Sequence, residues 1–171
     1  MKLLCDQMSE AISECLHHSQ HGFKVGKSIL TNLAQFTPFI LCKVEGKIAS
    51  GASQIDAVYT DFSKAFDRVD HGLLLLKLKK LGMPSEVVNW SASYLNGRTQ
   101  KVRIGGTLSE VLLVRSGVPQ GSHLGPLLFL LFINDITYFL KDVEFLLYAD
   151  DLKLYKTISN DSDALVLQLM L

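Results

Sequence analysis

The chain has few of the features that would place it outside the cell or within a membrane. It has only 3 cysteines among 171 residues, too few and too odd in number for a paired disulfide framework, and no segment resembles a secretory signal. We therefore expect a reducing, intracellular setting. The longest apolar run, Pro126 to Ile133, is far shorter than the roughly 20 residues of a membrane span, so it predicts a buried core segment.

Net charge is also missing. The 17 basic and 17 acidic residues cancel, so no overall field attracts nucleic acid, and any such surface must be local. There is no internal repeat and no low-complexity segment. Apolar residues, in contrast, are abundant: they make up 48% of the chain, enough for one domain with a sizeable core. This high share also suggests surface that is normally buried against another part.

The apolar pattern predicts helices and strands joined by short loops. Ser28 can cap a helix that runs through the forties, but we expect Pro38 to break or kink it, at a cost of about 3 kcal/mol. Gly46–Ser53 is predicted to be a flexible connector. The other predicted helices cover residues 2–18, 72–81, 84–95 and 124–140, with one more at the end, and the predicted strands cover 55–60, 99–104, 110–114, 145–148 and 152–155.

This order of elements indicates an α+β fold. Strands separated by helices, together with antiparallel hairpins, are typical of a sheet that helices cover on one face. The other face would then be free for a ligand.

The most informative stretch is Tyr148-Ala149-Asp150-Asp151, which places two acids at a turn between apolar strands. Like charges so close repel each other, and a divalent metal is the usual remedy. Carboxylate oxygens are hard ligands that suit Mg²⁺.

Asp61 is a candidate ligand for the same reason, because it is an acid at the end of another apolar strand. If the two strands are neighbours, the acids project from the same edge of one sheet. Two Mg²⁺ ions held about 4 Å apart at that edge would support an in-line phosphoryl transfer. The alternative interpretation is that these are ordinary turn aspartates, which such positions favour in any case.

Other residues near Asp61 have competing interpretations. Asp67 and Asp70 are rival ligands, although Asp70 is more simply explained as a helix cap and Asp67 as a turn or surface residue. Phe66 could form the floor beneath a bound sugar, but its position favours ordinary packing in the core.

The loop Ser116–Ser122 is a candidate ligand loop. It contains two glycines, a proline and Gln120 immediately before a predicted helix. Backbone amides at a helix start favour anions, and Gln120 can exchange hydrogen bonds with a base or a sugar.

Basic residues are candidates for weak contacts to a nucleic-acid backbone. Lys27 lies in a glycine-containing loop and could touch phosphate. Arg98, Lys101 and Arg103 form a small basic patch, and the equal parity of Lys101 and Arg103 predicts that both lie on one face of a strand. The histidine-rich stretch Cys15–His21 could be mistaken for a zinc site, but it has no second ligand pair at the spacing of structural zinc.

Taken in order, these segments resemble the reverse transcriptase domain of non-LTR retrotransposons, the LINE-type and jockey-like elements. The resemblance covers nearly the whole chain, although Lys27 stands where the family usually has arginine. The matching segments are residues 21–28, residues 58–71, a connecting pattern that includes Trp90, Tyr94, Arg98 and Gln100, residues 116–128, and residues 147–151.

The resemblance implies a polymerase palm, an antiparallel sheet backed by helices, over residues 55–171, with partial fingers over residues 1–54. It also implies roles for particular residues. Asp61 and Asp150 would be metal ligands, with Asp151 in support and the Phe62 carbonyl joining them. The remaining implied contacts are with the incoming nucleotide for Lys64, Ala65, Phe66 (the sugar gate), Gln120 and Gly121, and with the primer end for Tyr148.

The family resemblance further implies an RNA-directed DNA polymerase that uses Mg²⁺, with Mn²⁺ as a substitute. Its partners would be an RNA template, a DNA primer and deoxynucleoside triphosphates, with no membrane, in the nucleus and cytoplasm. Relative to the family, we expect the chain to begin inside the fingers and to end soon after the acidic hairpin, without thumb or endonuclease. We therefore expect weak or no activity from the chain alone.

Two other interpretations stay open. The chain could be a non-catalytic remnant that binds nucleic acid, although its zero net charge counts against this. It could also be a decayed product that does not fold stably, although no acid or motif glycine in the matching segments has been lost.

Overall fold

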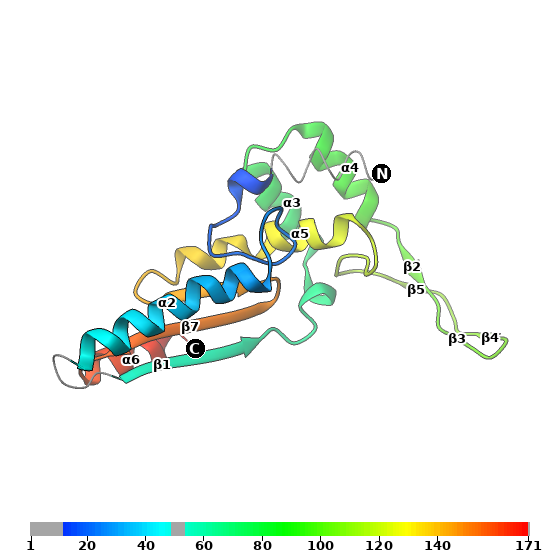
Figure 1. Cartoon of the computed structure of the whole chain (residues 1–171). Helices are drawn as coiled ribbons and strands as arrows, with labels where there is room; N and C mark the ends of the chain where they lie inside the picture. Colours follow the sequence, from blue (N-terminus) through cyan, green and yellow to red (C-terminus); the bar gives the residue numbers. More distant parts are fainter. Residues whose placement is uncertain (1–11, 49–53, 171) are drawn as a thin grey trace. The chain divides into compact units, whose positions relative to one another are not determined.

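The computed structural model describes residues 12–48 and 54–170. The chain divides into two compact units, one formed by Met1–Ser63 together with Ile133–Leu171, and the other by Lys64–Phe132. Figure 1 shows the elements coloured along the sequence. The described residues combine helices with antiparallel strands, so the predicted α+β class is confirmed.

The first unit is built on a three-stranded antiparallel sheet. Its strand order is β1-β7-β6, with β1 at Gln54–Asp61, β6 at Glu144–Tyr148 and β7 at Asp151–Ile158. The predicted strands at 55–60, 145–148 and 152–155 are therefore confirmed. The register places the acidic ends of β1 and β7 directly opposite each other, at Asp61 and Asp151.

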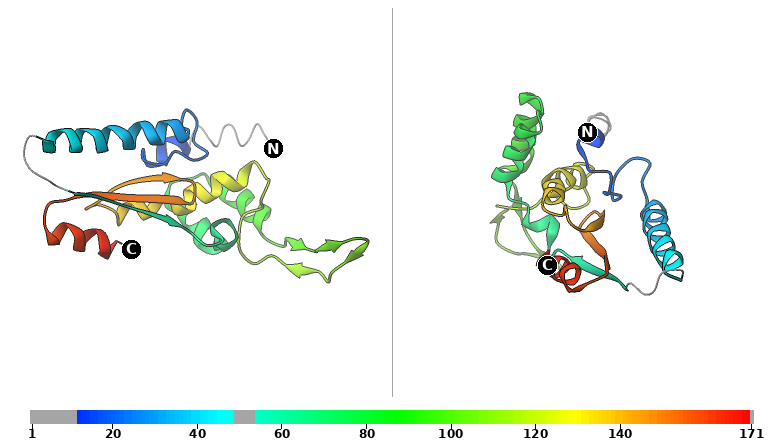
Figure 2. Two further views of the ribbon diagram at one scale, coloured as in Figure 1. Left: turned by 60° about the horizontal axis from the view of Figure 1, so that its bottom comes forward. Right: turned by 90° about the vertical axis from the view of Figure 1, so that its left-hand side faces the viewer.

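Alternate residues of β7 face different helices. Leu152 and Leu154 belong to a buried cluster with Leu167 of helix α6 (Asp161–Leu169). On the other face, Tyr155 contacts helix α2 (Ile29–Ile48) through two aromatic rings. The two helices thus cover opposite faces of the sheet (Figure 2). The expectation of one free face is therefore wrong, and the apolar side chains of α2 are the reason.

Helix α2 continues through its proline without a break. The Ser28 hydroxyl accepts a hydrogen bond from the Thr31 amide, which confirms the predicted cap. Phe36 and Phe39, on either side of Pro38, both pack edge-on against the Tyr155 ring, with centroid distances of 5.0 and 4.8 Å. This packing holds the helix on both sides of the proline. The predicted break is therefore wrong, and the alternative of a kink stays a prediction.

Two predictions at the edges of the first unit fall partly outside the described residues. Of the helix predicted over 2–18, residues 12–15 are helical and the chain leaves the helix at Leu16, while residues 2–11 lie outside the described part. Of the connector predicted over 46–53, residues 46–48 belong to α2, and the others lie outside the described part.

The second unit contains three α-helices, a short 3₁₀ helix and a long hairpin. Helix α3 (His71–Lys80) begins at Asp70, whose carboxylate accepts a hydrogen bond from the Leu73 amide, so the predicted cap is confirmed. Helix α4 (Ser85–Leu95) follows Pro84 as predicted. A short 3₁₀ helix, η1, covers Ala65–Arg68. The hairpin pairs β2 (Thr99–Gln100) with β5 (Leu112–Leu113), and β3 (Arg103–Ile104) with β4 (Thr107–Leu108), around the predicted Gly105-Gly106 turn.

The apolar helix α5 (Leu124–Ile133) is shorter than predicted. Leu124, Leu128 and Leu130 are fully buried, so the run forms core as expected. The helix gives way to a 3₁₀ helix, η2, at Asn134–Tyr138. The Asn134 side chain accepts a hydrogen bond from the His17 amide and donates one to the Cys15 carbonyl. The α-helix therefore ends before the predicted residue 140, and the 3₁₀ helix covers most of the remainder. Among the described residues, no helix is both long and apolar enough to cross a membrane.

Candidate active site

Three aspartates converge at one end of the sheet in the first unit. Asp61 is the last residue of β1 and lies opposite Asp151, the first residue of β7. Asp150 lies in the two-residue turn that joins Tyr148, at the end of β6, to Asp151. The acids that the sequence singled out are therefore brought together by the strand register.

This arrangement has an electrostatic cost. Like charges directly opposite each other on neighbouring strands destabilise a sheet. Burial raises the pKa of the Asp151 carboxyl, and the nearby charges of Asp150 and Asp61 raise this pKa further. All three carboxylates thus contribute to one region of negative potential.

The donor chemistry of this region fits a hard divalent cation. Such a cation prefers carboxylate oxygens, and it would offset the repulsion that raises the pKa of Asp151. Over residues 12–48 and 54–170, however, no three His, Cys, Asp or Glu side chains are gathered closely enough to hold a metal ion. The donors are present at one sheet edge, but their side chains would need to move closer together to share an ion.

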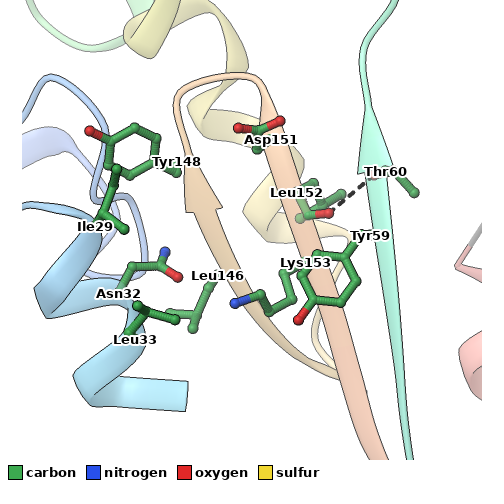
Figure 3. Close-up of a pocket in the computed structure, with 10 residues that line it drawn as sticks. All are labelled: Ile29, Asn32, Leu33, Tyr59, Thr60, Leu146, Tyr148, Asp151, Leu152 and Lys153. Carbon is green, nitrogen blue, oxygen red and sulfur yellow. Dashed lines mark hydrogen bonds between the residues drawn. The ribbon is translucent and has the colours of Figure 1, made fainter. Parts of the chain in front are cut away.

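A cavity of about 450 Å³ opens beside the acids, between α2 and the sheet. Figure 3 shows Asp151 at its upper end, with Tyr148 on one side and Tyr59 and Lys153 along the strands. The Lys153 ammonium lies 4.2 Å from the centre of the Phe36 ring and 5.1 Å from that of Tyr59. Burial lowers the pKa of this lysine.

Lys153 was not recognised as a site residue from the sequence. The signal was present, because Asp151 and Lys153 are two residues apart on one strand and so share a face. What the sequence did not show is that helix α2 closes over that face.

A short N-terminal stretch, Ser19–Gly22, packs against the acidic turn and the end of β6. We call this stretch the anchor segment. The Leu147 amide donates to the Ser19 carbonyl, and the His21 amide donates to the Leu147 carbonyl, so this stretch pairs in parallel with β6. Gln20 is buried and bonds to both backbone polar groups of Ala149. The sequence interpretation missed this contact.

The histidines of the former zinc candidate have structural partners. The His21 ring bonds to the Thr31 hydroxyl at 2.8 Å and to the Gln35 amide oxygen at 3.2 Å. Burial lowers the pKa of His21, the Gln35 hydrogen bond raises it, and the charges of Lys27, Lys24 and His18 lower it. His17 stacks on Phe145 with 5.1 Å between ring centres.

The predicted nucleotide contacts lie in the second unit. Phe66 stacks on the buried ring of Phe129, with 4.3 Å between centroids, which supports the packing interpretation of this residue. The Gln120 amide nitrogen donates to the Asp67 carboxylate at 2.9 Å. Lys64 precedes η1 in a left-handed conformation with φ of 53°.

The loop Ser116–Ser122 is held tightly against η1. The Val118 amide donates to the Phe66 carbonyl, and a Cβ on Gly117 would come within 2.8 Å of the Asp67 backbone. A cavity of about 630 Å³ lies along this loop. Its lining includes Lys64, Arg98, Arg115 and Gln120.

The basic patch is exposed along the hairpin. Lys101 and Val102 separate β2 from β3 along the chain and belong to neither strand, so the parity argument for Lys101 and Arg103 loses its basis. At this interruption of the strand, the Ser109 hydroxyl accepts a hydrogen bond from the Val102 amide. Arg98 lies over the Tyr94 ring, at 5.4 Å.

The predicted site residues are thus divided between the two units. The first unit holds Lys27, Asp61, Phe62, Tyr148, Asp150 and Asp151, and the second holds Lys64, Ala65, Phe66, Arg98, Lys101, Arg103, Gln120 and Gly121. The convergence of the acids within one unit is the strongest feature, and the individual roles stay predictions.

Known proteins are similar to this chain in sequence. The family model described as "Reverse transcriptase (RNA-dependent DNA polymerase)" matches residues 1–170. The chain is 35% identical to a probable RNA-directed DNA polymerase from transposon BS of Drosophila melanogaster, over 90% of this chain and 17% of that protein. It is 34% identical to the RNA-directed DNA polymerase from mobile element jockey of the same species, over 87% of this chain and 16% of that protein. The chain therefore spans only about a sixth of the length of these relatives.

Solved structures show the same fold at low identity. Apo telomerase from Candida tropicalis, truncated from its C-terminal domain, superposes with a TM-score of 0.66 at 14% identity, over 99% of this chain and 35% of that chain. Telomerase from Candida albicans, in complex with the TWJ fragment of telomeric RNA, gives a TM-score of 0.65 at 15% identity, over 96% of this chain and 31% of that chain. At such identities the likeness shows the mixed α+β fold alone.

Proposed function

The chain belongs to the reverse transcriptase family, within the domain found in jockey-like non-LTR retrotransposons, and from this premise we propose that it carries the catalytic acids of an RNA-directed DNA polymerase. The observation that supports this proposal most is the register of β1 and β7, which sets Asp61 against Asp151 beside Asp150. In the proposed architecture, residues 55–171 are palm and residues 1–54 are partial fingers.

In the proposed reaction, Asp61, Asp150 and Asp151 bind divalent cations, assisted by the Phe62 carbonyl. When bound, two Mg²⁺ or Mn²⁺ ions would lower the cost of charge on the attacking 3′-hydroxyl and on the leaving pyrophosphate. The three carboxylates would hold the positive charge of these cations at the sheet edge. Tyr148, which is half-buried immediately before the turn, would contact the primer end.

The proposed substrates are an RNA template, a DNA primer and deoxynucleoside triphosphates. In the second unit, the backbone of Lys64 and Ala65 and the loop containing Gln120 and Gly121 would meet the nucleotide. Phe66 would limit the space at the sugar 2′ position. Four cations, Lys27, Arg98, Lys101 and Arg103, would contact phosphates of the nucleic-acid backbone.

Primer extension with the 171-residue chain tests this proposal. The assay contains an RNA template, a DNA primer, deoxynucleoside triphosphates and Mg²⁺. We expect low, non-processive extension, since the chain has zero net charge and so little long-range attraction for a duplex. Asp61→Asn and Asp150→Asn should each reduce this extension by on the order of 100-fold or more.

Asp56→Asn is the matched control, because Asp56 lies on the same strand as Asp61 but away from the acidic turn. It should leave extension unchanged. Template binding without any extension, insensitive to Asp61→Asn, would contradict the proposal and favour a non-catalytic binding protein. A broad, non-cooperative thermal transition would instead favour a chain that does not fold stably.

A further inference from the structure

We propose that Gln20 is a positioning residue that fixes the conformation of the acidic turn and thereby the placement of Asp150. This inference rests on the proposed function above, because the turn matters only if its acids bind cations. The argument starts from the backbone of the turn itself.

Ala149 has an unfavourable backbone conformation. Its φ of 58° lies in the left-handed region, which costs a residue with a Cβ about 1–2 kcal/mol relative to the right-handed region. Such a conformation persists only where the surroundings hold it in place. Ala149 is buried, at 5% exposed, and stands between Tyr148 and Asp150. A change in its backbone angles would redirect the Asp150 side chain.

Two hydrogen bonds from the Gln20 side chain hold this conformation. The amide oxygen of Gln20 accepts a hydrogen bond from the Ala149 backbone amide at 2.9 Å, and the amide nitrogen of Gln20 donates one to the Ala149 carbonyl at 3.4 Å. One planar side chain thus contacts both polar groups of one residue, which fixes their relative direction. Gln20 is only 2% exposed, so water does not compete for these hydrogen bonds.

The Gln20 amide is itself held in place. Its oxygen also accepts the Gly22 amide at 2.8 Å, and the residues on either side of Gln20 pair with Leu147 of β6. Gly22 packs so closely that a Cβ there would overlap the Ala149 backbone nitrogen. The anchor segment therefore packs against the turn so closely that position 22 has no room for a side chain.

Gln20→Met tests the proposal, because methionine keeps a similar length and removes the hydrogen bonds. The first readout is hydrogen exchange of the Ala149 amide by NMR, with the Leu147 amide as internal reference, since its partner is the Ser19 backbone. We expect exchange at Ala149 to rise at least about 10-fold while Leu147 keeps its protection. The second readout is Mn²⁺ affinity, which should fall about 10- to 100-fold.

Asn134→Ala is the matched control. Asn134 also uses a side-chain amide to hold the backbone of the N-terminal region, but at Cys15 and His17 rather than at the turn. It should lower the free energy of unfolding without changing Ala149 exchange or Mn²⁺ affinity. If both variants weaken Mn²⁺ binding equally, or if neither readout moves in Gln20→Met, the positioning role is wrong.

Two further variants separate this inference from the proposed function. If Asp61→Asn and Asp150→Asn leave Mn²⁺ binding unchanged, the proposed metal site fails and the inference fails with it. If they abolish binding while Gln20→Met does not weaken it, only the inference fails. Should Gln20→Met not fold, Gln20→Glu replaces it. A carboxylate can still accept a hydrogen bond from the Ala149 amide but cannot donate one to the Ala149 carbonyl. Exchange at Ala149 should then rise above that of the parent chain while Leu147 keeps its protection, and unchanged exchange would overturn the positioning role.

Discussion

The two hairpins of this molecule are built in opposite ways. In the acidic hairpin, residues 144–158, both sheet faces are covered, and its turn is held by a buried glutamine. In the basic hairpin, residues 99–113, every residue is exposed and the ladder is interrupted at Lys101 and Val102. Local stability follows buried contacts, so the acidic hairpin should open rarely and the basic hairpin often.

The difference matches the chemistry proposed for each hairpin. Ligands of a shared metal ion must be held within a fraction of an ångström, which requires a supporting shell of packed residues. Contacts with a nucleic-acid backbone tolerate more movement, because they are electrostatic and carry no sequence information.

The largest effect is expected where the anchor segment meets the acidic turn. Gly22→Val should lower the free energy of unfolding by about 3 kcal/mol, because its Cβ would overlap the Ala149 backbone. Gly106→Ala in the basic hairpin is the control, since a Cβ there meets nothing within 4 Å, and it should change the free energy of unfolding by no more than about 0.5 kcal/mol. Urea unfolding of both variants measures the difference, and equal losses would remove the contrast between the hairpins.

The anchor segment should also make stability depend on pH. The pKa of His21 is lowered mainly by burial, so the unfolded chain takes up a proton near pH 6.5 that the folded chain resists. Stability from this residue is therefore full above pH 6.5 and is lost as the pH falls below it. His21→Gln should flatten this part of the profile of thermal midpoint against pH.

A remaining slope is expected in that variant, because burial also lowers the pKa of His17. His123→Gln, at an exposed position outside the anchor segment, should leave the profile unchanged. If His21→Gln keeps the full slope of thermal midpoint against pH between pH 7 and 5, protonation of His21 is not the cause of that slope.

A smaller effect of the opposite sign is expected at the acidic turn. The pKa of Asp151 is raised in the folded chain, so the folded state holds a proton that the unfolded state releases, and stability is lost as the pH rises above about 4. Asp151→Asn should therefore raise the thermal midpoint at pH 7 without divalent cations. Adding Mg²⁺ should raise the midpoint of the parent chain more than that of the variant. A lower midpoint for the variant would show that the acids do not repel each other.

The smallest effect on stability is expected in the basic hairpin. Arg103→Ala should leave the free energy of unfolding within about 0.5 kcal/mol of the parent, because the side chain is exposed. If Arg103 contacts phosphate, the slope of binding affinity against salt should fall by about 1. Fluorescence anisotropy with an RNA–DNA duplex measures this slope, and an unchanged slope would remove Arg103 from the interface.

The parts of the fold that the sequence could predict are those set by neighbours along the chain. Apolar runs that end in carboxylates located β1 and the acidic hairpin. Asp70 was recognised as a cap, and its partner, Leu73, is only three residues away. The acids of the candidate site were found in the same way. They stand at strand ends, where a row of apolar residues gives way to carboxylates.

The parts that could not be predicted depend on partners far along the chain. Helix α2 continues past Pro38 because Phe36 and Phe39, which flank the proline, both pack against the ring of Tyr155. Helix α5 gives way to η2 at Asn134, whose side chain bonds to the backbone of Cys15 and His17. Gln20 supports the turn across a separation of 129 residues, and no local pattern marks such a contact.

That separation also sets an order of events during synthesis. Ser19–Gly22 leaves the ribosome long before β6 exists, so Gln20 has no partner until the residues between it and Ala149 have been made. Contacts between distant residues slow folding and leave apolar surface open to chaperones or to aggregation in the meantime. The turn that bears the acids should accordingly take its final conformation later than the turns whose partners lie close along the chain.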